Sequence, residues 1–218
     1  MKKNSIFGFM MAILFSFVIG FTSCQSCKGD QSAANDEPAI NQTKAELVVE
    51  NLISTDRQDM YMQHAKDYRW FETCVVLKDF LDEECDGTVA GVSNIFQAVE
   101  AKENGADVFV VMYTHTPDTA DVQVVHSFWV EDLPMENEQI KLTFKEAFDR
   151  VMQANAPKPH SQHVVLRKEL GPINCNPQYI FGNQKSQLYV DAVTGDVRTS
   201  NPVFPEEKGF KMPLGEWP

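Results

Sequence analysis

The sequence lacks the short motifs of the common nucleotide-binding and hydrolytic enzymes. It contains no GxSxG, HExxH, GxxxxGK[ST] or GxGxxG pattern, and its Ser, His and Asp residues show no diagnostic spacing. It also lacks basic clusters, because no Lys/Arg run is longer than two, as at Arg167-Lys168. The formal net charge is −12, and an acidic surface repels phosphate, so we expect no nucleic-acid partner. These absences favour a protein without catalytic activity.

The sequence also lacks an apolar run of the length of a usual transmembrane helix. The apolar residues 6–21 follow Lys2 and Lys3 and precede Ser23 and Cys24. A helix of that length reaches about 24 Å, whereas the hydrocarbon core is roughly 30 Å thick. A basic start, a short apolar core and small residues before a break are the features of a secretory signal peptide. An uncleaved membrane anchor is the alternative.

The cysteine at the end of this segment makes it resemble a bacterial lipoprotein signal. The resemblance implies that residues 1–23 are removed and that the sulfur of Cys24 carries lipid. Stable anchoring needs more than one acyl chain, and bacterial lipoproteins carry several. Gln25 stands where Asp would resemble an inner-membrane retention signal, so we expect the outer membrane. Removal of two lysines and no acids changes the charge from −12 to −14.

Residues 24–42 are polar and lack periodic apolar residues, which predicts a flexible tether. Export places the remaining cysteines in a disulfide-permissive compartment. Cys85 and Cys175 have polar, turn-like surroundings and are the best candidates for a disulfide, although four cysteines (with Cys27 and Cys74) allow three pairings. Cys74 lies in an apolar run, which favours an inert buried thiol. The folded part has no CxxC motif, which disfavours a thioredoxin-like site.

The first half of the folded part reads as helix followed by strands. Thr43 and Glu46 have capping-box spacing and begin an apolar helical pattern that ends at Ile53. A second helical stretch is expected over residues 56–68. Aromatic and β-branched runs then predict four antiparallel strands, at about residues 70–81, 89–99, 108–116 and 122–131.

The second half repeats this order. Thr143 and Glu146 again have capping-box spacing, and a helix of about twelve residues is expected to end before Pro157. Strands follow at about residues 163–170, 178–181 and 187–193. The sequence therefore predicts an α+β protein of two units, each with a helix packed on a small antiparallel sheet. These units are residues 43–135, which could suit a cystatin-like fold, and residues 136–218, which include a Pro-rich tail.

The run Tyr-Val-Asp-Ala-Val-Thr-Gly-Asp-Val at residues 189–197 resembles the closing strand and turn of PepSY domains. The resemblance covers residues 142–204. PepSY domains occur beside peptidases and in secreted or membrane proteins, and are thought to restrain proteolysis or bind partners. The resemblance therefore implies a binding or inhibitory module with no catalytic residues. Gly195 is expected to supply the positive φ of a tight turn, and Asp191 to accept turn hydrogen bonds.

Two functions remain open at this level. The first is a lipid-anchored, non-enzymatic binding or inhibitory module whose partner is an envelope protein or peptidase. Its partner surface would be an exposed strip in the tail with Phe204, Phe210 and Trp217, unless these residues pack over the sheet. The alternative is a small-ligand receptor or enzyme with a cavity in the first sheet, lined by Trp70, Phe96, Phe109, Tyr113 and Phe128.

No metal or other cofactor is expected. The pairs His160/His163 and His115/His126 supply two ligands each, whereas metal sites need three or four converging ligands. The acidic turn around Cys85 lacks the alternating oxygen ligands and central glycine of a calcium loop.

Overall fold

The computed structural model describes residues 46–102, 105–183 and 186–204. These residues belong to one compact unit that begins at Gln42. The signal segment with Cys24, the tether, and the tail residues Phe210 and Trp217 lie outside the described residues. Among the described helices, none is long and apolar enough to cross a membrane.

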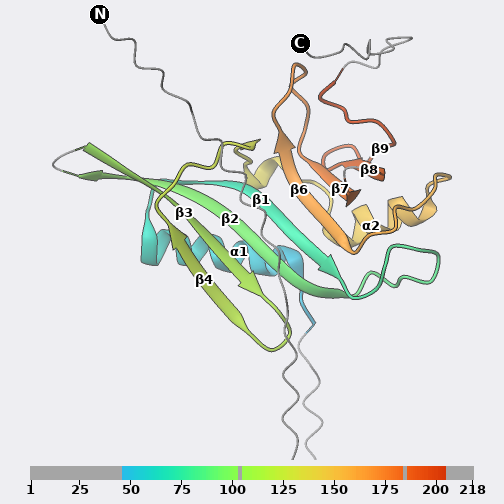
Figure 1. Cartoon of the computed structure of the whole chain (residues 1–218), viewed down its shortest axis with the longest axis horizontal. Coiled ribbons are helices and arrows are strands. Elements are labelled where there is room, and N and C mark those ends of the chain that lie inside the picture. Colours follow the sequence, from blue (N-terminus) through green and yellow to red (C-terminus); the bar gives the residue numbers. More distant parts are fainter. Residues whose placement is uncertain (1–45, 103–104, 184–185, 205–218) are drawn as a thin grey trace, which may run out of the picture. The chain divides into compact units, whose positions relative to one another are not determined.

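The described chain contains a helical segment followed by four strands, and then a second helix followed by four strands (Figure 1). The first set is α1 (Val49–Asp59), continued by a π-helical turn η1 (Met60–His64), then β1 (Tyr68–Leu77), β2 (Val89–Lys102), β3 (Gly105–His115) and β4 (Ala120–Val125). The second set is α2 (Phe144–Gln153), β6 (His163–Glu169), β7 (Gln178–Asn183), β8 (Ser186–Asp191) and β9 (Val197–Arg198). Between them lie a short strand β5 (Asp132–Leu133) and a 3-10 turn η2 (Asn137–Gln139).

All strands form one antiparallel sheet in the order β4-β3-β2-β1-β6-β7-β8-β9, and β5 pairs with β6. The α+β class is therefore confirmed, but the expectation of two units with separate sheets is wrong. Strand β1 pairs with β2 on one side and with β6 on the other, with Thr73 opposite Leu166. This pairing closes an edge that each half would otherwise expose. A cystatin-like unit is likewise not what the first half forms, because its strands are part of the shared sheet.

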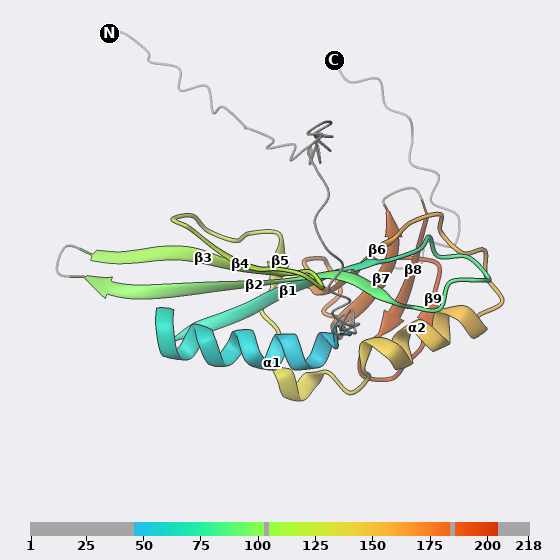
Figure 2. The same ribbon diagram turned by 90° about the horizontal axis from the view of Figure 1, so that it is seen from below.

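Both helices lie on the same face of the sheet (Figure 2), and the core lies between them and the strands. The stripe predicted on α2 is confirmed, since Phe144, Ala147, Phe148 and Val151 are buried. Its predicted capping box is also present. The Glu146 N–H donates to Thr143 Oγ1 at 3.2 Å, and the Thr143 N–H donates to Glu146 Oε2 at 2.7 Å.

The start of α1 differs from the prediction. The helix begins at Val49 without a side-chain cap, and residues 46–48 are not helical. The two helical stretches expected before β1 are one continuous segment through η1. Its buried stripe contains Val49, Ile53, Asp56 and Met60. The buried stripe includes the carboxylate of Asp56. In the sequence this aspartate interrupts the apolar pattern, which is why one helix was expected as two.

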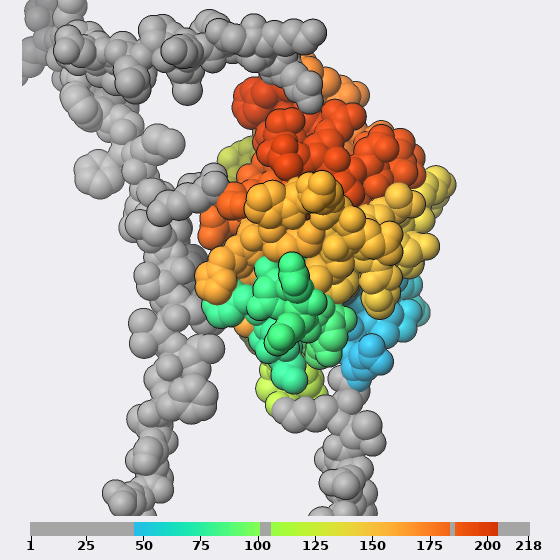
Figure 3. Space-filling view, turned by 90° about the vertical axis from the view of Figure 1, so that its right-hand side faces the viewer, coloured from blue at the N-terminus to red at the C-terminus, as the bar shows by residue number. Residues whose placement is uncertain are grey.

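The loop between β1 and β2 packs against α2. A Cβ on Gly87, where φ is +80°, would lie 3.0 Å from the ring of Phe148. Figure 3 shows this end of the molecule, with the green β1–β2 loop beside the yellow-orange segment that contains α2. The β1–β2 loop is therefore part of the α2 end of the molecule.

Candidate functional site

The most unusual surface of the described chain is the edge strand β4. All six of its residues are exposed, so neither face of the strand is covered. The side chains of Val122, Val124 and Val125 are 45–49% exposed. Figure 1 shows β4 as the outermost strand, with β3 on one side and no described element on the other.

The first helical segment contacts β3, the neighbour of this edge strand. On β3, Val111 and Tyr113 are buried on the helix side, and the ring of His64 in η1 lies edge-on to Tyr113 with centroids 6.2 Å apart. Their direct neighbours on β4 are Val124 and Val122. These two valines therefore lie on the core-facing side of the sheet but remain about half exposed.

The two ends of the sheet differ in how they are protected against pairing with another chain. Natural edge strands are shortened, charged, bulged or interrupted by proline. Strand β9 has two residues and carries Arg198. Strand β4 has six residues, contains no proline, lysine or arginine and has Asp121 as its one charged residue, and its register against β3 runs without a bulge from Val125 to Ala120. The β4 edge is therefore open to a further strand, whereas the β9 edge is blunted.

The segment that leaves β4, residues 126–131, also carries exposed apolar side chains. Phe128 is 68% and Val130 is 72% exposed. Trp129 between them is fixed, since its backbone N–H donates to Gln97 Oε1 at 2.6 Å and its Nε1 donates to Asp132 Oδ2 at 3.3 Å. We refer to Val122, Val124, Val125, Phe128 and Val130 together as the apolar edge surface. Exposed apolar side chains gathered on an edge strand and the segment after it are typical of interaction sites.

The stretch of sequence that carries this surface is acidic. No lysine or arginine lies between Lys102 and Lys141 in the sequence. Asp121 and Glu131 are exposed. The imidazole of His126 lies beside a carboxylate, with Nδ1 3.2 Å from Asp107 Oδ1.

A second polar site lies on the face of the sheet away from the helices. The Arg167 guanidinium lies 2.6 Å from Glu169 Oε1, 3.5 Å from Asp132 Oδ1 and 3.7 Å from Glu72 Oε2. The Asp132 side chain is completely buried. Burial, and next the charge of Glu72, raise the pKa of Asp132 to about 7. The cluster therefore holds a proton near neutral pH, at the point where the segment after β4 joins the sheet.

A third polar site joins α1 to the sheet within the core. The buried Asp56 carboxylate accepts from Asn94 Nδ2 at 2.6 Å and lies 2.9 Å from His115 Nε2. Thr73 Oγ1 donates to Asn94 Oδ1 at 2.5 Å and accepts from Trp70 Nε1 at 3.2 Å. Burial raises the pKa of Asp56, although these hydrogen bonds oppose the shift. The side chains of this hydrogen-bonded network satisfy one another, as buried polar groups require. The role of the network is therefore to hold α1 on the sheet.

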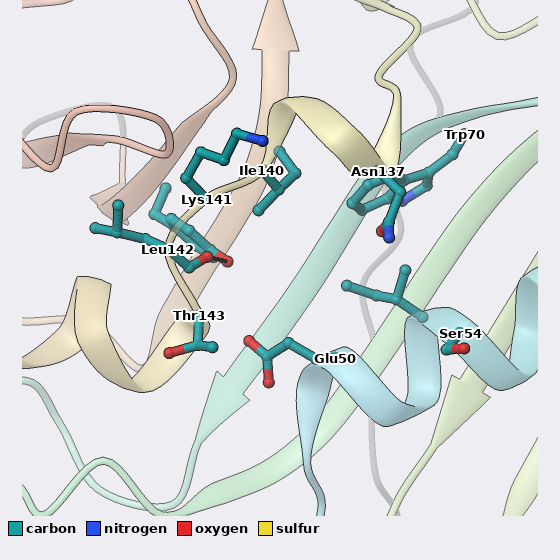
Figure 4. A pocket seen from close by; sticks show the side chains of 10 residues that line it. Glu50, Ser54, Trp70, Asn137, Ile140, Lys141, Leu142 and Thr143 are labelled. Carbon is teal, nitrogen blue, oxygen red and sulfur yellow. Dashed lines mark hydrogen bonds between the residues drawn. The ribbon is translucent and has the colours of Figure 1, made fainter.

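A hollow of about 170 Å³ lies between α1 and the segment before α2 (Figure 4). Glu50 points across it and accepts from the Phe144 N–H at 2.5 Å, which ties the two helices together. Typical sites for small molecules measure roughly 300–1,000 Å³. The hollow is therefore small for such a ligand.

The aromatic residues expected to line one cavity in the first sheet do not converge on one, although Trp70 lines the small hollow of Figure 4. Trp70, Phe96, Phe109 and Tyr113 are buried members of the core, and Phe128 is exposed on the apolar edge surface. Among the described residues, no group of three or more His, Cys, Asp or Glu side chains has a geometry that could hold a metal ion. His115 lies at Asp56 and His126 at Asp107, while the ring of His160 stacks on Phe80.

The proposed Cys85–Cys175 disulfide is not formed, and this prediction is wrong for the structure. Cys74, Cys85 and Cys175 are all free thiols. Cys85 lies in the loop after β1, near the start of β6, whereas Cys175 lies in the loop after the end of β6. A disulfide needs Cα atoms within about 7 Å, and a strand the length of β6 separates the two loops. Both cysteines have polar neighbours in the sequence, but such neighbours do not show at which end of the sheet each cysteine lies.

The turn with PepSY-like residues has the local geometry that the sequence predicts. Gly195 has a φ of +79°. Asp191 Oδ1 accepts from the N–H groups of Val193 and Thr194 at 2.9 and 3.0 Å. Burial acts to raise the pKa of Asp191, but these hydrogen bonds outweigh it and lower the pKa.

The predicted tail surface is described only in part. Phe204 is exposed, whereas its neighbour Val203 is buried and its backbone accepts from the Ile173 N–H at 3.1 Å. Phe210 and Trp217 lie outside the described residues. The apolar edge surface was missed in the sequence because β4 reads like any other apolar strand. The signal that could have indicated it is the absence of lysine, arginine and proline from that strand.

The chain shows no significant match to a protein-family model, to a curated protein or to a solved structure.

Proposed function

We propose that this chain is a lipid-anchored binding module of the cell envelope that acts by presenting the apolar edge surface to a protein partner, without catalysis. The observation that carries this proposal is that all six residues of β4 are exposed, on an edge strand that contains no proline, lysine or arginine. A stable folded protein gains nothing from an edge that invites aggregation unless the edge has a use. Recognition of a partner is that use.

The location is part of the proposal and comes from the sequence. The residues before Cys24 resemble a lipoprotein signal, so we place the protein at the outer membrane with lipid on Cys24. The tether of residues 24–42 would let the folded part reach partners away from the membrane surface. The PepSY-like run at residues 189–197 supports a role beside an envelope protein such as a peptidase.

The test is capture of partners from the native envelope by cross-linking, with a matched pair of variants. Val124 and Val99 lie on the same sheet and are 46% and 48% exposed. Val124→Lys places a charge on the apolar edge surface, and Val99→Lys places the same charge on the interior strand β2. We expect capture to fall at least about tenfold for Val124→Lys and to persist for Val99→Lys, since interface centres tolerate charge poorly.

A third variant tests the tail as the partner surface. Phe204→Lys changes the one exposed tail residue in the described chain that was predicted to contact a partner. Loss of capture in Phe204→Lys with full capture in Val124→Lys would assign the function to the tail. A hydrolytic or transfer activity abolished by one polar substitution in a folded variant would contradict the proposal altogether.

A further inference from the structure

The backbone of β4 determines the conformation of the partner. Its only strand neighbour in the described chain is β3, so about half of its N–H and C=O groups point away from the sheet. An extended polypeptide segment can pair with such groups by adding itself as a further strand. The six residues of β4 match the length of an ordinary strand.

The side chains of β4 differ between its two faces. Val122 and Val124 point to the helix side, beside the buried Tyr113 and Val111. The alternate residues, including Asp121 and Val125, point to the other face. An added strand would therefore meet a purely apolar face on the helix side and a face with an exposed carboxylate on the other.

The charge around this edge selects the polar residues of the partner. The stretch between Lys102 and Lys141 contains no lysine or arginine, and Asp118, Asp121 and Glu131 on it are exposed. A cationic segment is attracted to such a surface and an acidic one is repelled. Pairing with a second copy of this chain would bring two acidic edges together.

From these observations we infer that β4 binds an extended polypeptide segment in which apolar residues alternate with lysine or arginine. Its apolar residues would lie over Val122 and Val124, and its basic residues would lie on the face that carries Asp121. This inference rests on the proposed function and adds the chemistry of the partner. The partner is thus an amphipathic, basic strand rather than a helix or a second copy of the chain.

Two synthetic eight-residue peptides test the inference on the full chain in detergent. One peptide alternates valine with lysine, and the other alternates valine with glutamate. We expect only the first to bind, to slow hydrogen exchange in the β4 segment, and to bind more weakly as salt is raised. Val124→Lys should weaken its binding at least about tenfold, and Val99→Lys should leave it unchanged.

Three results would overturn the inference. They are equal binding of both peptides, binding of the lysine peptide that Val124→Lys does not weaken, and absence of any binding. Self-association of the chain through β4, measured by sedimentation, would replace the basic strand with a second copy. If the peptides fail while capture from the envelope still depends on Val124, the partner chemistry is wrong and the proposed function stands. If capture also fails to depend on Val124, both are wrong.

Discussion

At the scale of single residues, Asp132 makes the stability of the folded state depend on pH. Its pKa of about 7 exceeds the ordinary value of 3.8, so the folded state binds more protons than the unfolded state between these values. Stability from this group is present at low pH and is lost as pH rises toward 7. We expect Asp132→Asn to remove this dependence and to raise the melting temperature at pH 8.

The matched control for Asp132 is its neighbour Glu131, which is exposed. Glu131→Gln also removes one carboxylate, at the adjacent position. It should leave the pH dependence of the melting temperature intact. Thermal unfolding followed by circular dichroism from pH 5 to 8 measures both variants. Identical pH profiles for Asp132→Asn and the unmodified chain would show that the carboxyl is not a proton site.

Asp56 stabilises the fold by pairing with the buried polar groups of Asn94 and His115. Asp56→Ala leaves Asn94 Nδ2 without its acceptor and His115 without its carboxylate. Removal of one partner of a buried polar network costs about 2–4 kcal/mol. We expect that loss in denaturant unfolding, and a smaller loss for Asp56→Asn, which keeps an acceptor for Asn94. A change below about 0.5 kcal/mol in Asp56→Ala would mean that water replaces the carboxylate.

At the scale of elements, the β8–β9 turn depends on one glycine. Gly195 has a φ of +79°, and a Cβ there would lie 2.4 Å from Cζ of Arg150 on α2. Gly195→Val should cost on the order of 1–2 kcal/mol or more through the backbone conformation alone. It would also displace Arg150, whose Nη1 donates to the Gly195 carbonyl at 3.3 Å.

Gly91 supplies the control for this turn. It lies in β2, and a Cβ there would meet His115 O at 3.5 Å, an ordinary contact. We therefore expect Gly91→Ala to change the free energy of unfolding by less than about 1 kcal/mol, since glycine is poorly suited to a strand interior. Equal destabilisation by the two substitutions would show that positive φ is not what Gly195 provides.

At the scale of the whole molecule, attachment to the membrane should depend on one sulfur. We expect Cys24→Ser to abolish lipid labelling and to move the protein out of the membrane fraction, because acylation supplies the anchoring energy. Cys27→Ser, three positions along, is the matched control and should remain attached. Membrane attachment of Cys24→Ser would instead indicate that residues 6–21 remain as an uncleaved helix.

The sequence by itself determined the features that depend on neighbouring residues. Most strands of both halves, the Thr143–Glu146 cap and the turn at Gly195 were predicted close to their observed positions. The strand expected at 122–131 was only partly right, because β4 spans Ala120–Val125, and the short strands β5 and β9 were not predicted. Each follows from side-chain periodicity, a local hydrogen bond or a backbone conformation, which a short segment carries within itself. The α+β class follows from the same patterns.

The tertiary structure decided the features that depend on residues far apart in the chain. The pairing of β1 with β6 made one sheet from two expected units, and it placed Cys85 and Cys175 at opposite ends of β6. The packing of α1 on the sheet buried Asp56, because Asn94 and His115 meet it only when β2 and β3 lie beside α1. The exposure of β4 arises in the same way. An apolar strand becomes an exposed edge only when the fold places it outermost, and no local pattern records that fact.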